Sequence, residues 1–393
     1  MPETPESVGV GSLAGKRIAI VGNTDWSLYN FRLPIAVEAR RLGAEVTLVT
    51  PDGPHVAAMR QAGFRHHEIQ MSQRGMNPLQ DLLLMGQLGR LYHAEGFELV
   101  HHCSIKPVIY GSLAARLAGT PAVVNAVTGL GYVFSEGGGG GRRLVRRLVE
   151  TLYHVALSDT HCWAIFQNRS DQDFFETKGW VAPSRSVTIP GSGVDVDVFR
   201  ADPARTSSTP VALFLGRLLR DKGVETFHEV ARRLKAQGSD AEFWIAGGAQ
   251  TAHPGGVPQA TLEAWRREGV VQLLGHRSDI RDVIQRSWVV VLPSLYGEGV
   301  PKSLLEAAAL GKPLVAYDVG GCRDIVRPGV SGVRVPPGDV EALATAVGSL
   351  LRDGTSREVL GAGARRLVER DFSLRSVLER SMATYVAALR GTR

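Results

Sequence analysis

Residues 297–313 read GEGVPKSLLEAAALGKP and set two carboxylates, Glu298 and Glu306, around a proline and a run of helix formers. Pro301 suits the first position of a helix, where its missing N–H costs nothing, and Gly311 suits the helix end. A helix that begins behind a glycine loop presents backbone N–H groups and a positive dipole end, which favour phosphate. Glu298 would repel a phosphate, so it cannot bind one directly. We expect the two glutamates to accept hydrogen bonds from hydroxyl groups that lie on either side of the phosphate. The competing interpretation is a capped amphipathic helix with two solvated glutamates.

A second cluster of charge follows the apolar run VALFLG, where Arg217 and Lys222 precede Gly223. Two cations on a loop that opens a helix can both contact a diphosphate and neutralise a leaving group. Such an arrangement does without a bound divalent metal, and we expect none. The competing interpretation is an ordinary basic loop.

The elements that must position these side chains alternate along the chain between short β-branched runs and longer helical patterns. Apolar runs bounded by turn residues predict buried parallel strands. They are KRIAIVGN, AEVTLVT, FELVHHCS, PAVVNAV and CWAIFQN in the first half, and PVALFLGR, AEFWIAGG, VVQLLGH, SWVVVLPS and KPLVAYD in the second. Helical periodicity that ends in glycine marks LPIAVEARRLG and PVIYGSLAARLAG between them. Two successive βαβ blocks predict an α/β fold of two Rossmann-like domains that face each other across a cleft.

The domain boundary is expected within residues 187–210, which are rich in Gly, Pro, Ser and Asp. The predicted division is a disordered tail (1–15), an N-terminal domain (16–190), a hinge (191–210), a C-terminal domain (211–370) and a final helical segment (371–393). The tail carries acids, Pro and Gly but no apolar stretch of the kind found in signal peptides.

The composition, with 393 residues of which 44% are hydrophobic, is that of a globular protein too long for one ordinary core. Cys103, Cys162 and Cys322 are far apart and lack metal-ligand spacing, which predicts free thiols in a reducing compartment. No stretch approaches the length of apolar residues that a membrane span requires. We therefore expect a cytoplasmic protein.

The formal net charge of +6 is compatible with nucleic acid, an anionic small molecule or a membrane surface as partner. Charge gathers after a five-glycine run, where RRLVRRLVETLYHVAL carries Arg142, Arg143, Arg146 and Arg147 on one face of an expected helix. A basic amphipathic helix can rest on an anionic cytoplasmic leaflet. The competing interpretation is a solvated arginine face on a core helix.

Three other kinds of site are not expected. Asp195 and Asp197 imitate a DxD metal motif, but they lie in the expected hinge and not at a strand end. The glycine-rich residues 9–15 precede the first strand, which argues against a nicotinamide dinucleotide site. No nucleic-acid-binding motif accompanies the basic charge, so nucleic acid is not an expected partner.

The ordered pair GRLLRDKG (216–223) and EGVPKSLLE (298–306) resembles the retaining nucleotide-sugar glycosyltransferases of GT-B fold in family 4. The segments NTDWSLYNFRLPIA, HHCSIKPVIYGSLAARLAG, VNAVTGLGYVF, FQNRSDQDFF and GSGVDVDVF extend the resemblance over nearly the whole chain. They are similar to the subgroup that builds bacterial capsule, O-antigen and related surface glycans. The resemblance implies an N-terminal acceptor domain, a C-terminal nucleotide-sugar domain, and a C-terminal helix that returns to the N-terminal domain.

The same resemblance implies donor-binding roles at matching positions. Arg217 and Lys222 would contact the diphosphate and stabilise departing UDP. Glu298 would bind the donor sugar, and Glu306 the ribose hydroxyls. The donor set also includes Gly299, Val300, Pro301 and Lys302 around the phosphate, His276 and Arg277 at the base, and Thr128 and Gly129 near the sugar. Many family members carry a histidine where this chain has Thr128, and a threonine cannot hold a positive charge.

Acceptor contacts are expected from residues at the N-terminal strand ends, namely Trp26, Asn30, Arg32, His102 and Lys106. Lys106 or Arg32 could bind a phosphate of the acceptor, and His102 could assist proton transfer. The competing interpretation of the histidine is a packed or solvated residue.

The expected function is transfer of a hexosyl or N-acetylhexosaminyl group from a UDP-sugar to a saccharide linked to a polyprenyl diphosphate. The resemblance implies retention of anomeric configuration, with no metal or other cofactor, at the inner face of the plasma membrane. Two alternatives remain. One is a UDP-sugar 2-epimerase of the same architecture, and the other is a non-catalytic nucleotide-sugar-binding subunit.

Overall fold

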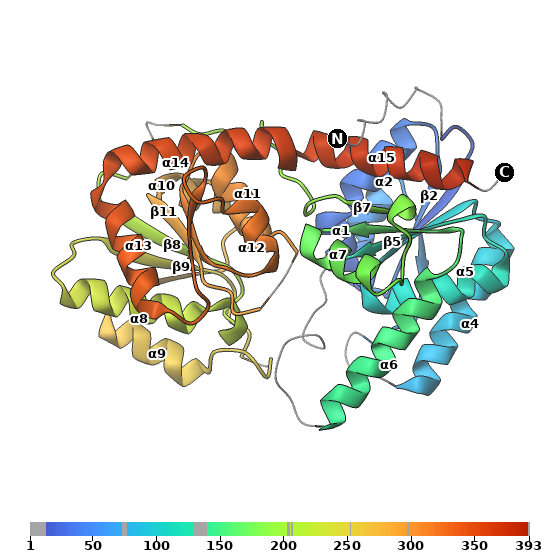
Figure 1. Cartoon of the computed structure of the whole chain (residues 1–393), viewed down its shortest axis with the longest axis horizontal. Helices are drawn as coiled ribbons and strands as arrows, with labels where there is room; N and C mark the ends of the chain where they lie inside the picture. Colours follow the sequence, from blue (N-terminus) through green and yellow to red (C-terminus); the bar gives the residue numbers. More distant parts are fainter. Residues whose placement is uncertain are drawn as a thin grey trace. The chain divides into compact units, whose positions relative to one another are not determined.

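The computed structural model describes residues 13–72, 77–128, 140–202, 205, 207–251, 253–296 and 299–391, without the side chains of residues 140–144. The chain divides into two compact units (Figure 1), residues 1–192 with 377–393 and residues 193–376. Each unit contains one parallel sheet with helices on its faces. The predicted α/β fold with two Rossmann-like domains is therefore confirmed.

The sheet of the first unit has seven strands in the order β3-β2-β1-β4-β5-β6-β7, all parallel. Their bounds are β1 Arg17–Val21, β2 Glu45–Thr50, β3 Arg65–Glu68, β4 Leu99–Cys103, β5 Ala122–Val127, β6 Cys162–Phe166 and β7 Ser186–Thr188. Strands β4 and β5 are buried along their whole length. A strand with both faces covered must be apolar throughout, which is why these runs were recognisable in the sequence.

Helices cover both faces of this sheet. Helices α1 (Asp25–Phe31), α2 (Leu33–Arg41), α3 (Val56–Gln61) and α15 (Leu374–Arg390) share one core cluster with it. The opposite face carries α4 (Pro78–Glu95), a π-helical turn η1 (Pro107–Gly111), α5 (Ser112–Ala118), α6 (Gly140–Leu157) and α7 (Arg169–Thr177). A short 3₁₀ turn, η3 (Pro183–Arg185), leads into β7.

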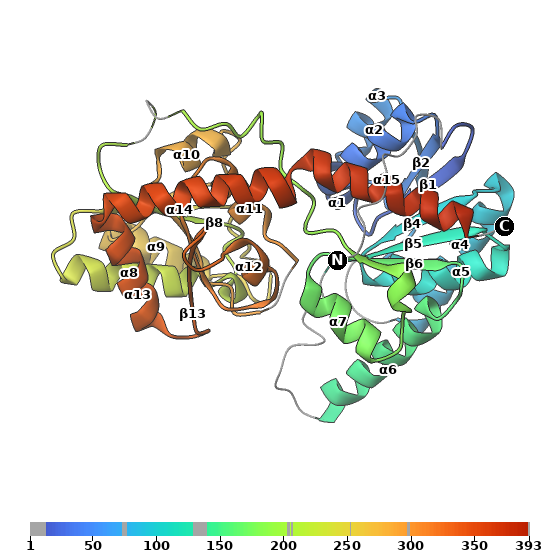
Figure 2. The ribbon, with the colours of Figure 1, turned by 45° about the horizontal axis from the view of Figure 1, so that its top comes forward.

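The last helix, α15, belongs to the core of the first unit although it follows the second unit in the chain. Val377, Met382 and Ala388 are buried against the sheet, and the helix lies beside α2 in both views (Figures 1 and 2). The fully buried Tyr385 hydroxyl is 2.5 Å from His101 Nδ1 on β4. The return of the C-terminal helix to the N-terminal domain is thus confirmed.

The second unit has six parallel strands in the order β10-β9-β8-β11-β12-β13. The strands are β8 Val211–Leu215, β9 Glu242–Ala246, β10 Gln272–Gly275, β11 Val289–Leu292, β12 Leu314–Tyr317 and β13 Gly332–Val335. The helices are η5 Arg220–Lys222, α8 Val224–Ala236, α9 Gln259–Glu268, α10 Ile280–Arg286, α11 Lys302–Ala309, α12 Gly320–Ile325, α13 Val340–Arg352, α14 Gly354–Leu367 and η6 Val368–Phe372. Helix α8 packs against α13, and α11 packs against α14.

Three strands, β3, β7 and β13, had no counterpart among the predicted runs. All three lie at an edge of their sheet, are short, and are partly exposed. An edge strand buries fewer side chains, so its sequence does not need the continuous apolar run on which the prediction relied.

The segment after residue 192, expected as part of a hinge, is fixed to the second unit. The Val194 N–H donates to the Phe372 carbonyl at 3.1 Å, and the Leu374 N–H donates to the Val194 carbonyl at 2.8 Å. The Arg365 guanidinium donates to the carbonyls of Val196 and Phe199. The two units therefore divide at residues 192/193 and 376/377.

Candidate active site

Strand order reverses once in each sheet, between β1 and β4 in the first unit and between β8 and β11 in the second. At such a switch point the loops after the two strands diverge, and ligands bind in the crevice beyond the carboxyl ends. Arg217 and Lys222 follow β8, and residues 299–306 follow β11. The two motifs that are distant in the sequence therefore meet at one switch point.

A hydrogen bond and a close backbone approach hold these two loops together. The Leu295 N–H, after β11, donates to the Asp221 carbonyl, after β8, at 2.9 Å. Gly223 has a φ of +75°, and a Cβ atom there would meet the Pro293 carbonyl oxygen at 2.0 Å. Only glycine suits both the left-handed conformation and this contact.

Arg217 is exposed and forms no ion pair with any carboxylate in the described part of the chain. Lys222 ends the 3₁₀ turn η5 and is half-buried. Two cations that follow the same strand, one of them on a short turn that ends at a glycine, can both contact one anion. This loop is therefore suited to a phosphate or diphosphate.

Helix α11 begins at Lys302, and Pro301 is its N-cap residue, one position before the predicted one. The N–H groups of Leu304 and Leu305 both donate to the Pro301 carbonyl at 3.1 Å. Pro301 has an extended ψ of 125° and caps the helix without a side-chain hydrogen bond. The N-terminal dipole end of α11 is thus directed at the loop that contains Gly299 and Val300, both buried.

Glu306 lies in the second turn of α11 and keeps only 12% of its side chain exposed. Its nearest described cation is Lys302, with Nζ 3.9 Å from Oε1. Burial raises the pKa of the Glu306 carboxyl to about 7, and the Lys302 ammonium opposes the rise. A carboxyl that is costly to ionise and weakly paired is a typical feature of a ligand site.

The remaining predicted donor residues have different surroundings. Glu298 and Gly129 lie outside the described residues, and Thr128 follows β5 in the first unit, half-buried. His276 and Arg277 are exposed after β10, an edge strand of the second sheet. Arg277 forms two hydrogen bonds to Asp279, at 2.7 and 2.5 Å, so its guanidinium is already engaged. A base pocket at this loop stays a prediction.

The predicted acceptor residues include two cations, whose environments differ. Lys106 Nζ donates to Asp81 Oδ1 at 2.8 Å and to Ser72 Oγ at 2.7 Å, and the Asp81 side chain is buried. Tyr110 donates to the other Asp81 oxygen at 3.1 Å. Lys106 is therefore part of a closed ion-pair cluster between α4 and the start of η1.

Arg32, by contrast, is 7% exposed and forms no ion pair with any carboxylate that the structure describes. Burial raises the pKa of the Cys103 thiol, and the guanidinium of Arg32 beside it opposes this rise. A sulfur atom compensates a guanidinium poorly, and a buried charge without an opposite charge is destabilising. Arg32 is therefore suited to receive an anion at the carboxyl edge of the first sheet.

His102 is fully buried, which corrects the expectation that it assists proton transfer to or from an acceptor. Its Nδ1 is 2.9 Å from Asn125 Oδ1 and its Nε2 is 2.9 Å from the Tyr92 hydroxyl. Burial lowers the pKa of His102 to about 4. Both ring nitrogens of His102 form hydrogen bonds inside the core, so the interpretation of a packed histidine holds.

The other two predicted acceptor residues lie on α1. Trp26 is half-exposed, and its carbonyl accepts a hydrogen bond from Asn30 Nδ2 at 2.9 Å.

Two residues at the first switch point were not named from the sequence. Ser104, directly after β4, has a φ of +80°, and it is the one non-glycine residue with a positive φ among those described. Asn23, two residues after the end of β1, accepts hydrogen bonds at its side-chain oxygen from Ser104 Oγ and Ser27 Oγ, each at 3.1 Å. Strained backbone at a strand end is common in functional sites. The position of a serine directly after a buried strand was the signal available in the sequence.

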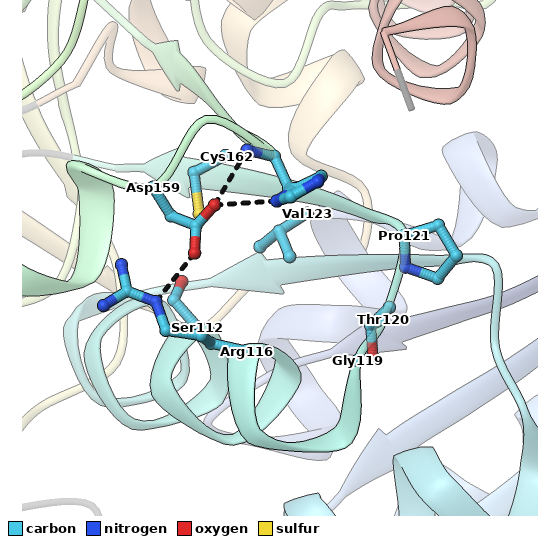
Figure 3. A pocket seen from close by; sticks show the side chains of 9 residues that line it. Ser112, Arg116, Gly119, Thr120, Pro121, Val123, Asp159 and Cys162 are labelled. Carbon is cyan, nitrogen blue, oxygen red and sulfur yellow. Dashed lines mark hydrogen bonds and ion pairs between the residues drawn. The ribbon is translucent and has the colours of Figure 1, made fainter. Parts of the chain in front are cut away.

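A pocket of about 220 Å³ lies at the opposite edge of the first sheet (Figure 3). Its lining includes Arg116 and Asp159, which are bonded at 2.7 Å, and Pro121 just before β5. It is at the amino ends of β5 and β6, whereas the switch point of this sheet is at the carboxyl ends of β1 and β4. We assign this pocket no role in the candidate active site.

No three His, Cys, Asp or Glu side chains gather into a metal-binding group in the described part of the chain. Asp195 Oδ1 accepts from the N–H groups of Asp197 and Val198, both at 3.0 Å, so the imitation of a DxD motif is a turn. None of the described helices is long and apolar enough to cross a membrane.

Two family models match the chain, one in each unit. Residues 17–160 match the model described as "Glycosyl transferase 4-like", and residues 209–353 match "Glycosyl transferases group 1". The chain belongs to the family 4 glycosyltransferases of GT-B fold. A relative of this glycosyltransferase is the Campylobacter jejuni N,N'-diacetylbacillosaminyl-diphospho-undecaprenol alpha-1,3-N-acetylgalactosaminyltransferase, 27% identical over 88% of this chain and 93% of the relative.

A second relative is the Escherichia coli UDP-Gal:alpha-D-GlcNAc-diphosphoundecaprenol alpha-1,3-galactosyltransferase, 25% identical over 80% of this glycosyltransferase and 81% of the relative. Among solved structures, Anabaena HepE in complex with UDP superposes with a TM-score of 0.75 and 19% identity, over 95% of this chain and 100% of that one. The structural likeness confirms the GT-B fold.

Proposed function

We propose that this glycosyltransferase moves a hexosyl or N-acetylhexosaminyl group from a UDP-sugar to a saccharide carried on a polyprenyl diphosphate, with retention of anomeric configuration and without a metal ion. Its product would belong to a bacterial surface glycan. The observation that carries the proposal is the joined pair of loops at the second switch point. They combine two cations, a helix N-terminus and a buried, weakly paired carboxyl.

The donor would bind with its diphosphate against the N-terminus of α11, where the dipole and backbone N–H groups favour anions. Arg217 and Lys222 would contact the same phosphates from the β8 side. Glu306, further along α11, would accept hydrogen bonds from the ribose hydroxyls once it is ionised. Glu298 would lie on the other side of the phosphates and accept from hydroxyls of the donor sugar. This order of groups matches one nucleotide sugar from end to end.

The chemical step breaks the bond between the anomeric carbon and the β-phosphate oxygen, and negative charge develops on departing UDP. Arg217, Lys222 and the helix dipole would stabilise that charge, which is the largest contribution expected from the protein. The acceptor hydroxyl would attack from the face that UDP leaves, and its proton would pass to a phosphate oxygen. Such front-face attack retains configuration and requires no protein nucleophile.

On the acceptor side, Arg32 is the better candidate for a phosphate of the lipid carrier. Lys106 is neutralised by Asp81 at 2.8 Å, whereas Arg32 forms no ion pair with any described carboxylate. A phosphate at Arg32 would supply the missing opposite charge. The two relatives named above act, by their names, on undecaprenol-diphosphate-linked sugars, which supports an acceptor of this class.

The test is a transfer assay with radiolabelled nucleotide sugars and bacterial membrane lipid as the acceptor source, run in parallel with and without EDTA. Label from one UDP-sugar should move into the organic phase at the same rate with and without EDTA. The variant Arg217→Ala should lower transfer by about a hundredfold or more. The matched control is Arg220→Ala on the same loop, which should transfer like wild type because Arg220 already pairs with Glu225 at 3.3 Å.

Three results would contradict the proposal in different ways. Conversion of the donor to an epimer without any transfer would favour the epimerase. UDP binding without any turnover across the panel would favour a non-catalytic subunit. Loss of transfer in EDTA, restored by a divalent cation, would contradict metal independence alone.

A further inference from the structure

Asn23 connects the loops that follow the two strands of the first switch point. It lies two residues after the end of β1 and contacts Ser104, which directly follows β4, the parallel neighbour of β1 (Figure 2). Ser104 Oγ donates to Asn23 Oδ1 at 3.1 Å, and Ser27 Oγ on α1 donates to the same oxygen at 3.1 Å. The amide oxygen of Asn23 therefore accepts from two hydroxyl groups that belong to separate elements.

These two hydrogen bonds determine which end of the amide is available to a ligand. A carbonyl oxygen has two lone pairs, so two hydroxyl donors use its full capacity. The Nδ2 group is at the other end of the amide, and none of the residues that the structure describes accepts a hydrogen bond from it. Asn23 is half-buried at the carboxyl edge of the first sheet. The amide therefore offers N–H donors at this edge and no acceptor.

The backbone at Ser104 supports a role for its hydroxyl. The φ of +80° lies in the left-handed region, which is costly for any residue with a Cβ atom. A glycine would adopt this conformation without that cost, but it would lack the hydroxyl that donates to Asn23. Serine at this position therefore favours a function for the hydroxyl over a purely conformational one.

We propose that Asn23 binds the acceptor saccharide through Nδ2, and that Ser27 and Ser104 are positioning residues that hold its amide in this orientation. The inference rests on the proposed function, in which the acceptor binds at the carboxyl edge of the first sheet. An uncharged N–H donor suits a hydroxyl, ether or N-acetyl carbonyl oxygen of a sugar, whereas a phosphate favours a charged donor such as Arg32. The two side chains would thus bind different parts of one lipid-linked saccharide.

This orientation of the amide has a consequence for acceptor specificity. The amide of Asn23 cannot turn its oxygen toward the ligand without losing both serine hydrogen bonds. It would therefore select a sugar that presents an oxygen at this point. A deoxy analogue without that oxygen would leave Nδ2 unpaired, and its kcat/KM should be lower by about tenfold or more.

The experiment compares the steady-state kinetics of Asn23→Ala and Asn23→Asp with wild type, on a short-chain, water-soluble acceptor. Asn23→Ala should lower kcat/KM for the acceptor about tenfold and leave the affinity for UDP unchanged. Asn23→Asp keeps an oxygen for both serine hydroxyls and replaces only the N–H donors. It should therefore melt close to wild type and yet lose at least as much acceptor kcat/KM. The matched control is Gln61→Glu, the same chemical change at the exposed end of α3, which should leave these kinetics as in wild type.

A double-mutant cycle tests the positioning role of the two serines. Ser27→Ala combined with Ser104→Ala should lower acceptor kcat/KM severalfold when Asn23 is present. The same pair should have no further effect in the Asn23→Ala background, because the serines would act only through the amide. Equal losses in both backgrounds would show that the serines act independently of Asn23 and would overturn this role.

The outcomes separate this inference from the proposed function. If wild type transfers sugar and Asn23→Asp keeps wild-type acceptor kinetics, the inference alone is overturned. An equal loss of UDP affinity in Asn23→Ala would also overturn it, because Asn23 would then act on the donor. A wild type without any transfer would contradict the proposed function, and this inference with it.

Discussion

The protonation of Glu306 offers a quantitative test of the donor site. Its pKa of about 7 exceeds the ordinary value of 4.5, so the folded protein holds this proton more tightly than the unfolded chain does. The stabilising contribution of the protonated carboxyl is fully present below pH 4.5 and is lost as the pH rises through about 7. The difference corresponds to about 3 kcal/mol of unfolding free energy.

Glu306→Gln replaces the carboxyl with a neutral group of the same size. We expect the variant to be more stable than wild type at pH 8.5, by up to about 3 kcal/mol, and equal to it at pH 4. Because the chain has two units, thermal unfolding should be combined with hydrogen exchange of peptides from α11, which report on the second unit. Glu358→Gln, an exposed glutamate on α14, is the control and should change neither value.

The same substitution should weaken UDP binding, because an ionised carboxylate accepts two ribose hydroxyls and an amide oxygen is a weaker acceptor. The expected loss is roughly 2 kcal/mol, or about thirtyfold in Kd at pH 8. In wild type the affinity for UDP should fall as the pH drops below 7, and in the variant it should not. A variant that is no more stable at high pH, yet binds UDP normally, would refute both the burial argument and the ribose assignment.

Three further substitutions test the supporting structure. Gly223→Ala should lower the melting temperature more than Gly238→Ala does, because both have positive φ but only the first adds a clash with backbone; equal losses in thermal unfolding would contradict this. Arg217→Ala should reduce kcat by about a hundredfold or more with a smaller change in the donor KM, measured by steady-state kinetics; a KM effect alone would mean ground-state binding only. Tyr385→Phe should cost about 1–2 kcal/mol of stability by leaving His101 without its partner, and unchanged unfolding would show that α15 needs no such bond.

The sequence predicted those parts of the fold that are buried on both sides. The central strands of each sheet are continuous apolar runs because helices cover both faces, and every one of them was found. The edge strands β3, β7 and β13 were missed because partial exposure relaxes their sequence. The return of α15 could come only from resemblance, because contacts such as that of Tyr385 with His101 join residues at opposite ends of the chain.

For the candidate site, the sequence predicted which residues lie near the ends of strands, but not how their side chains are placed. The switch-point rule applies to residues after a strand, but His102 lies inside β4, which continues to Cys103, and its side chain is buried in the core. Nor does spacing show which cations are already neutralised. The Asp81 carboxyl that pairs with Lys106 lies in another helix, and only the structure distinguishes this lysine from Arg32.

The most direct test of the central claim is the configuration of the bond that the enzyme makes. The transfer assay identifies the UDP-sugar, whose sugar is α-linked to UDP. With that donor and with EDTA present, the anomeric linkage of the product should be followed by proton NMR from the first minutes of the reaction. The account predicts a new α-glycosidic linkage on the lipid-linked saccharide. A β-linkage would contradict the retaining, front-face mechanism, and a free epimer of the donor would contradict the transferase itself.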